Sequence, residues 1–125
     1  LSLHDALPIW ANAIVFHPDK KRLVTTGIDG TLKIHSIPDL KTLATLRGHL
    51  ENASGIAVSP DGLSLATIEN NAGLRIWRTD TLREVMHLKI PHTNEGIIFS
   101  PDGRHLAFTL QDAKGNSSVQ ILDAR

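Results

Sequence analysis

Cysteine is absent from the 125 residues of this sequence. The absence excludes disulfide bonds, thiolate zinc sites and cysteine nucleophiles. Long apolar runs are also missing, since none approaches the roughly 20 residues that a membrane-spanning helix requires. Neither sign of charge is in excess, because 13 Lys and Arg residues balance 13 Asp and Glu residues. We therefore predict neither direct binding to nucleic acid nor association with a membrane.

Motifs of enzymatic chemistry are missing as well. The sequence holds no Gly-x-Ser-x-Gly elbow, no glycine-rich phosphate loop with lysine and no His-Glu-x-x-His zinc motif. The carboxylates Asp19, Asp61 and Asp102 recur in one kind of turn, which favours a role in turn geometry. We therefore predict that the protein is not an enzyme and has no catalytic, cofactor-binding or metal-binding residue.

What the sequence does contain is an internal repeat. The tripeptides His17-Pro18-Asp19, Ser59-Pro60-Asp61 and Ser100-Pro101-Asp102 place their prolines 42 and 41 residues apart. A period of about 40–45 residues is typical of four-stranded propeller blades. Apolar residues recur at matching offsets with spacings of two, the period of a β-strand. The strands are predicted at about 13–16, 22–27, 32–35 and 42–47, then 54–59, 64–68, 73–78 and 83–89, then 95–100, 105–110 and 117–122.

The repeat predicts an all-β fold of four-stranded antiparallel blades. The blades are expected at about 11–47, 48–89 and 90–125, with the last one lacking its outer strand. Since propellers typically have about 4–8 blades, we expect the remaining blades to come from sequence that is missing here. Residues 1–9 have no place in the repeat and resemble a translated sequencing adapter. We therefore exclude them from the fold as an artefact, and assign 10–125 to the propeller.

The second unit carries Gly48-His49 before its first strand and Trp77 at the end of its third, with Thr67 and Asn71 between them. In these residues the sequence resembles the WD40 repeat family, over residues 11–125. The resemblance implies a partial WD40 β-propeller. It also implies a structural hydrogen-bond network of His49, Thr67, Asn71 and Trp77 that fixes the turn between the second and third strands.

The other units depart from this pattern. In the first unit Thr25 and Asp29 fit the network, but His35 stands where the family has tryptophan. In the second unit Arg78 replaces the aspartate of the Trp-Asp pair, and in the third Phe108 occupies the threonine position. We therefore expect apolar packing to hold the blades together more than the polar network does.

One loop is longer than its counterparts. Between the second and third strands the third unit holds four residues more than the other units, over residues 111–117. In repeat proteins such insertions often mark a binding face. The resemblance implies that this end of the blades docks protein partners. The residues predicted to contact a partner are Arg47, Glu51, Asn52, Glu69, Asn70, His92, Asn94, Asp112 and Lys114.

These observations favour a non-catalytic scaffold that mediates protein–protein interactions within a larger complex, in the cytoplasm or nucleus. A first alternative is the propeller part of a hydrolase or kinase whose catalytic domain lies in missing sequence. A second alternative rests on residues 30–41, which are similar, together with Gly48-His49, Ala66-Thr67 and Trp77, to the third-subunit family of the THO messenger-RNA export complex. That similarity implies a role in messenger-RNA processing.

Overall fold

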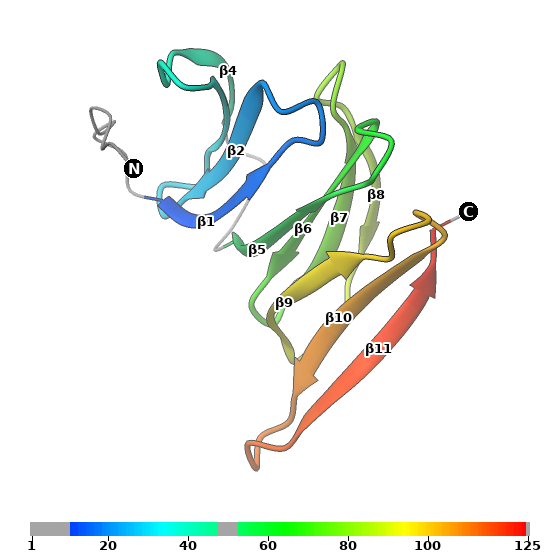
Figure 1. The fold of residues 1–125 in the computed structure, drawn as a ribbon. Helices are drawn as coiled ribbons and strands as arrows, with labels where there is room; N and C mark the ends of the chain where they lie inside the picture. Colours follow the sequence, from blue (N-terminus) through cyan, green and yellow to red (C-terminus); the bar gives the residue numbers. More distant parts are fainter. Residues whose placement is uncertain (1–10, 48–52, 125) are drawn as a thin grey trace, which may run out of the picture.

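The computed structural model describes residues 11–47 and 53–124. These residues form antiparallel strands in three sheets, two of four strands and one of three, and they contain no helix (Figure 1). No described segment is therefore a helix able to cross a membrane. The predicted all-β fold with antiparallel blades is confirmed. The segment 1–9 lies outside the described residues.

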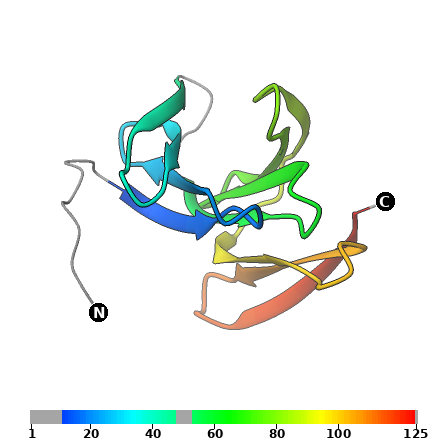
Figure 2. The same cartoon turned by 45° about the horizontal axis from the view of Figure 1, so that its top comes forward.

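Each sheet is one blade, and its strands pair in chain order. Blade 1 contains β1 (Ala11–Phe16), β2 (Arg22–Gly27), β3 (Leu32–Ser36) and β4 (Thr42–Leu46). Blade 2 contains β5 (Ala53–Val58), β6 (Ser64–Glu69), β7 (Gly73–Arg78) and β8 (Glu84–Leu88). Blade 3 contains β9 (Thr93–Phe99), β10 (His105–Gln111) and β11 (Ser117–Asp123). Figure 2 shows the three blades arranged in an arc, with β1, β5 and β9 toward its inner side.

Alternate side chains of each blade pack against the neighbouring blade, as the period of two predicts. At the junction of blades 1 and 2, Val24 and Ile34 meet Ile56, Leu65 and Trp77 in one buried cluster. The second junction buries another cluster, which comprises Ala66, Ile68, Leu74, Leu106 and Phe108. Burying one such side chain fully contributes about 1.5–3 kcal/mol, so these junctions hold the blades together.

The apolar faces at the two ends of the array are open. Ile14 and Phe16 of β1 are 63% and 67% exposed on the side away from blade 2. Ile98, Val119 and Ile121 are equally exposed on the outer side of blade 3. Their counterparts in blade 2 are buried or partly buried at a junction, so the end faces have the composition of inter-blade contacts.

The Pro-Asp tripeptides form the turns between the first and second strands of every blade. In each turn the aspartate accepts a hydrogen bond from the amide two residues on, at 2.8 to 3.0 Å. Ser59 and Ser100 each donate a further bond to the aspartate of their own turn, at 2.5 and 2.6 Å. The aspartates therefore stabilise turns, as their repetition predicted.

Up-and-down strands send the loops to two opposite ends of the blades. One end, here called the Pro-Asp face, carries the turns 17–21, 59–63 and 100–104. The other end, here called the crossover face, carries the turns 27–31, 69–73 and 111–116 and the connection 89–92 between blades. The described residues among those predicted to contact a partner lie at or beside this end of the blades.

Candidate protein-binding face

Loops of blades 2 and 3 are joined on the crossover face by backbone hydrogen bonds. The amide of Asn71, in the turn after β6, donates to the carbonyl of Thr93 at 3.2 Å. The amide of Gln111, at the end of β10, donates to the carbonyl of His92 at 2.8 Å. The β6–β7 turn, the connection 89–92 and the start of the long loop therefore form one surface.

The side chain of Thr93 strengthens this joint. It is 4% exposed, and its hydroxyl donates to the carbonyl of Glu69 at 2.5 Å while accepting from the amide of Gly73 at 3.1 Å. One threonine of blade 3 thus satisfies two backbone groups of the blade 2 turn. Because buried backbone groups need partners, Thr93 fixes how the two blades meet at this face.

A cavity of about 340 Å³ opens between these loops. The side-chain amide of Asn94 donates to the side-chain carbonyl of Gln111 at 3.2 Å across it, and the hydroxyl of Ser54 donates to the side-chain carbonyl of Asn70 at 3.0 Å beside it. The lining is composed of polar and small residues: Asn70, Asn71, His92, Thr93, Asn94, Gln111, Asp112 and Ala113.

The structure brings four of the predicted contact residues into this one cavity, namely Asn70, His92, Asn94 and Asp112. Lys114 lies in the β10–β11 hairpin and Arg47 follows β4 in blade 1; both are exposed, and neither lines the cavity. Glu51 and Asn52 lie outside the described residues, as does His49.

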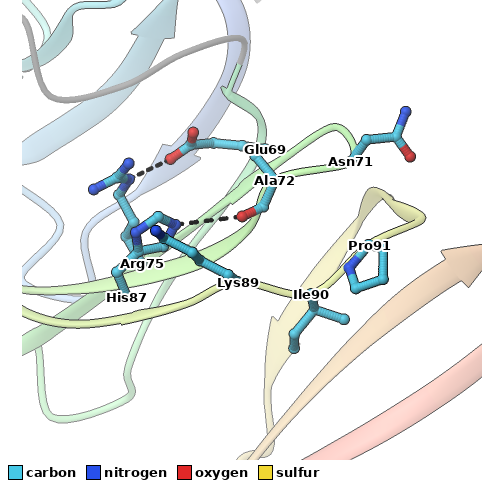
Figure 3. Close-up of a pocket in the computed structure, with 8 residues that line it drawn as sticks. All are labelled: Glu69, Asn71, Ala72, Arg75, His87, Lys89, Ile90 and Pro91. Carbon is cyan, nitrogen blue, oxygen red and sulfur yellow. Dashed lines mark hydrogen bonds and ion pairs between the residues drawn. The ribbon is translucent and has the colours of Figure 1, made fainter.

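The prediction that Glu69 is exposed to a partner is wrong. Its side chain is 1% exposed and forms an ion pair with Arg75, with 2.5 Å between Oε1 and Nε (Figure 3). Arg75 also pairs with Glu84 at 2.7 Å. Glu69 is the last residue of β6 and faces the neighbouring blade, so pairing with the arginine stabilises its charge away from solvent. An adjoining hollow of about 390 Å³ is lined by this pair and by His87 and Lys89.

Asp112 carries the negative charge of the cavity. Its carboxylate accepts the amides of Asn116 and Lys114, both at 2.9 Å. The hydrogen bond from the Asn116 amide is the largest cause that lowers the pKa of Asp112 below its usual range, and together with the bond from Lys114 it outweighs the opposing effect of burial. The residue is therefore ionised at neutral pH, and it orders the long loop around it.

Two of the residues assigned to the structural network make a bond in blade 2, where the indole nitrogen of Trp77 donates to the hydroxyl of Thr67 at 3.2 Å. In blade 1 the imidazole of His35 takes the place of the indole, 3.0 Å from the hydroxyl of Thr25. His35 is fully buried, and burial lowers its pKa, with the charge of Lys33 adding to the effect.

The two turn residues assigned to the network, Asp29 and Asn71, differ in their contacts. Asp29 bonds within its own turn, where it accepts from the amide and hydroxyl of Thr31 at 3.2 and 2.6 Å. Asn71 is exposed at the tip of its turn with a φ of 60°, and its side chain points away from Arg75 and His87 (Figure 3). Its hydrogen bond to Thr93 comes from its backbone N–H, which any residue except proline supplies.

Gln111 and Thr93 line the cavity but were not among the residues predicted to contact a partner, although Gln111 begins the long loop. Gln111 ends a strand and Thr93 begins one, and neither position has a motif of its own. The pairing of Gln111 with His92, nineteen positions earlier in the chain, is what brings them together. Only the position of blade 3 against blade 2 reveals these two residues.

Comparison with known proteins gives a consistent result. The family model described as WD domain, G-beta repeat matches residues 2–36 and 40–78, and the first match begins within the segment that was excluded as an artefact. Human apoptotic protease-activating factor 1 is 36% identical over 98 residues, which cover 70% of this chain and 8% of that protein. Pre-mRNA-processing factor 19 homolog 2 of Arabidopsis thaliana is 30% identical over 117 residues, covering 90% of this chain and 21% of that protein.

Among solved structures, U3-55K superposes with a TM-score of 0.72 at 17% identity, over 95% of this chain and 41% of that chain. Hydrazine synthase of Kuenenia stuttgartiensis gives a TM-score of 0.77 at 16% identity, over 93% and 40%. At such identities these two likenesses concern the fold alone. The chain spans less than a quarter of each of these two curated relatives and about two fifths of these solved chains.

Proposed function

This chain belongs to the WD40 repeat family, and we propose that it is a non-catalytic scaffold that holds a protein partner on its crossover face. The observation that carries the proposal is the gathering of Asn70, His92, Asn94 and Asp112 around one cavity, built by loops of two blades. The cytoplasm or the nucleus is the proposed location.

The chemistry of the cavity suits a polar segment of a protein. Amides and an imidazole offer both donors and acceptors, which are the groups that pair with a peptide backbone. The ionised Asp112 adds a preference for a basic or donor-rich partner segment. The loops are already joined by the bonds of Thr93, His92 and Gln111, so little ordering opposes binding.

The test is to remove polar groups from the cavity without disturbing the backbone. The variant His92→Gly/Asn94→Ala/Gln111→Ala keeps the backbone bonds of residues 92 and 111, and glycine suits the φ of 65° at position 92. Proteins recovered with the full-length wild type and with this variant are compared by quantitative mass spectrometry. At least one partner is expected to fall by about tenfold, the effect of losing about 1.4 kcal/mol of binding.

The matched control is Lys41→Ala, an exposed change on a turn of blade 1 at the opposite end. It is expected to leave the recovered partners unchanged. Identical partner sets for the wild type and the triple variant, with both proteins folded, would contradict the proposal.

A second candidate is a more specific form of the first, a subunit of an RNA-processing assembly. It is favoured by the names of relatives, since the pre-mRNA-processing factor covers 90% of this chain and a U4/U6 small nuclear ribonucleoprotein PRP4-like protein is 33% identical over 66 residues. Two results together would support it: the protein co-purifies with ribonucleoprotein particles, and the isolated protein does not bind RNA directly. A hydrolase or kinase domain found in the full-length chain would instead favour the enzyme alternative.

A further inference from the structure

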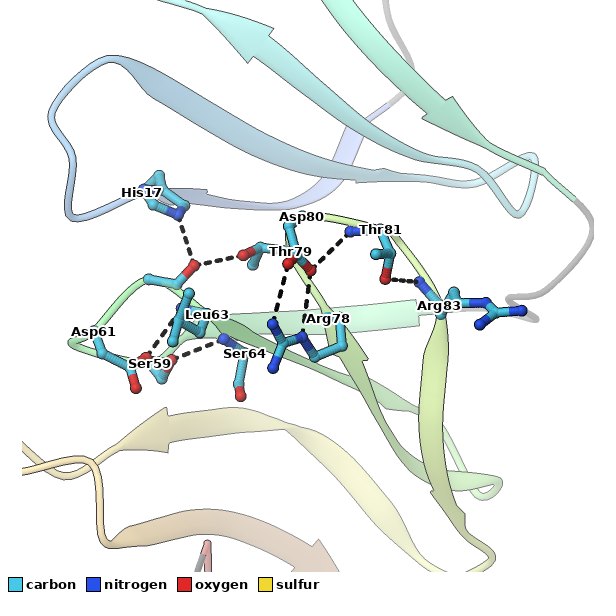
Figure 4. A network of polar contacts seen from close by, with 11 residues as sticks. His17, Ser59, Asp61, Leu63, Ser64, Arg78, Thr79, Asp80, Thr81 and Arg83 are labelled. Carbon is cyan, nitrogen blue, oxygen red and sulfur yellow. Dashed lines mark hydrogen bonds and ion pairs between the residues drawn. The ribbon is translucent and has the colours of Figure 1, made fainter.

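The Pro-Asp face has a contact between blades 1 and 2 that is filled by two large side chains. His17 of blade 1 lies with its Nε2 atom 2.9 Å from the carbonyl oxygen of Gly62 in blade 2 (Figure 4). The amide of Asp19 donates to the other ring nitrogen, so Nε2 carries the proton and donates. Thr79 donates to the same Gly62 carbonyl at 2.5 Å.

The second large side chain at this contact is that of Arg22. Its Nε donates to the carboxylate of Asp19 at 2.8 Å, and its Nη2 lies 3.2 Å from the ring of His17. An imidazole and a guanidinium thus occupy the space between the two Pro-Asp turns. Both are planar groups, and both present N–H donors to acceptors of the turns.

The equivalent contact between blades 2 and 3 has small residues at all three of these positions. The repeat places Ser59 where His17 stands, Ser64 where Arg22 stands and Ala124 where Thr79 stands. Gly103 occupies the place of Gly62, with φ angles of 74° and 76° at the two glycines. The loss of two large side chains leaves a cavity of about 370 Å³.

The lining of this cavity includes two carboxylates, those of Asp61 and Asp102. The hydroxyl of Ser59 donates to Asp61 and is therefore committed, and Ala124 has no donor to replace that of Thr79. The Gly62 carbonyl accepts from the side chains of His17 and Thr79. The side chains of Ser59 and Ala124 do not supply these donors to the Gly103 carbonyl. The lining comprises Ser59, Pro60, Asp61, Ser64, Phe99, Asp102, Gly103 and Ala124.

We propose that this cavity is a second docking site, which takes an arginine side chain of a protein partner. The guanidinium fills the space that His17 and Arg22 fill at the first contact, and it donates to the turn carbonyl and to the carboxylates of the Pro-Asp turns. Phe99 and Pro60 supply apolar walls for the flat face of the group. The site is on the opposite end of the blades from the crossover face, so it does not depend on the function proposed above.

The site is tested with N-acetyl-arginine amide as the probe, titrated into the full-length protein while the amide signals of the non-proline residues in 59–64 and 100–104 are followed by NMR. The signals of Gly103 and Ser59 are expected to shift with saturation. N-acetyl-citrulline amide, which has the same shape without the charge, is expected to bind at least about tenfold more weakly.

Two reciprocal variants connect the effect to the cavity. Ser59→His/Ser64→Arg introduces into this cavity the same residue types that fill the first contact. It is expected to abolish the probe-dependent shifts at Gly103. His17→Ser/Arg22→Ser creates the same opening at the first contact and is expected to add a probe-dependent shift at Gly62. If the first variant fails to fold, the second alone decides, because the wild-type titration is its reference.

The outcomes divide cleanly. Shifts at Gly103 that saturate with arginine, weaken with citrulline and vanish on filling the cavity support the proposal. No saturable shift at Gly103 overturns it, and so does equal binding of citrulline or unchanged binding after filling. A partner lost only through changes on the crossover face bears on the function proposed above and leaves this site to its own test.

Discussion

The indole nitrogen of Trp77 donates to the hydroxyl of Thr67 at 3.2 Å, and both side chains are 1% exposed or less. The bond joins β7 to β6 inside the junction of blades 1 and 2. His35 and Thr25 make the corresponding contact in blade 1 at 3.0 Å, so an imidazole substitutes for an indole at the same register position.

The first prediction concerns this bond. Thr67→Val keeps the shape of the side chain but removes the acceptor, and the loss of one such hydrogen bond costs about 0.5–1.5 kcal/mol. Thr67→Ser retains the hydroxyl and is expected to cost less than Thr67→Val. Chemical denaturation followed by tryptophan fluorescence measures both, and equal stability of wild type and Thr67→Val would refute the expectation.

The second prediction is a pH dependence from His35. Its folded pKa is lowered by burial, so the unfolded state binds more protons near the ordinary value of 6.5. Stability from this residue is therefore full above about pH 6.5 and is lost as the pH falls below that value, toward the lowered folded pKa. His35→Gln is expected to reduce the dependence of stability on pH between pH 7 and 5, measured by thermal unfolding. An undiminished slope would assign the dependence to other groups.

The third prediction compares the same turn position in three blades. Gly62 and Gly103 have positive φ angles of 76° and 74°, but blade 1 has Lys20 there, at 66°. A left-handed residue with a side chain costs about 1–2 kcal/mol, which the greater chain entropy of unfolded glycine partly offsets. Lys20→Gly is therefore expected to stabilise by up to about 1 kcal/mol. Lys20→Ala removes the same charge but retains the strain, and equal melting temperatures of the two variants would contradict this reasoning.

The fourth prediction separates backbone strain from steric overlap. Gly73 has a φ of 100°, and a Cβ there would overlap the carbonyl oxygen of Leu88. Gly115 has a φ of 84°, but nothing lies within 4 Å of its added Cβ. Gly73→Ala is expected to destabilise by about 3 kcal/mol or more, and Gly115→Ala by about 1 kcal/mol. Denaturant midpoints for the two variants check the difference, and similar losses would rule out overlap as the larger cause.

Most of the strands could be predicted because their local signals agree. The ranges 22–27 and 73–78 match β2 and β7 to the residue, since a Pro-Asp or Gly turn bounds an alternating apolar run at each. β9 begins at Thr93 instead of 95, because its first residues pair with the end of β10. That pairing joins β9 to β10, and no local signal in the sequence marks it.

The candidate site was predictable in part for a related reason. Asn70, His92, Asn94 and Asp112 are polar residues in loops at one end of the blades, which the repeat alone indicates. Glu69 comes one residue before Asn70 and is the last residue of β6. Its side chain therefore points toward the neighbouring blade. Its ion pair with Arg75 is a contact between strands, so residue type alone did not distinguish the two.

The period of the sequence by itself determined the blades, the Pro-Asp turns and the alternation of buried side chains, because strand geometry and turn chemistry act over a few residues. The tertiary structure alone decided which loops meet, which acidic residue is buried and which inter-blade contact is left open. Those outcomes depend on the packing of one blade against the next, where His17 fills one junction and Ser59 leaves its counterpart empty. Contacts between blades join residues about forty positions apart, beyond the reach of any local pattern.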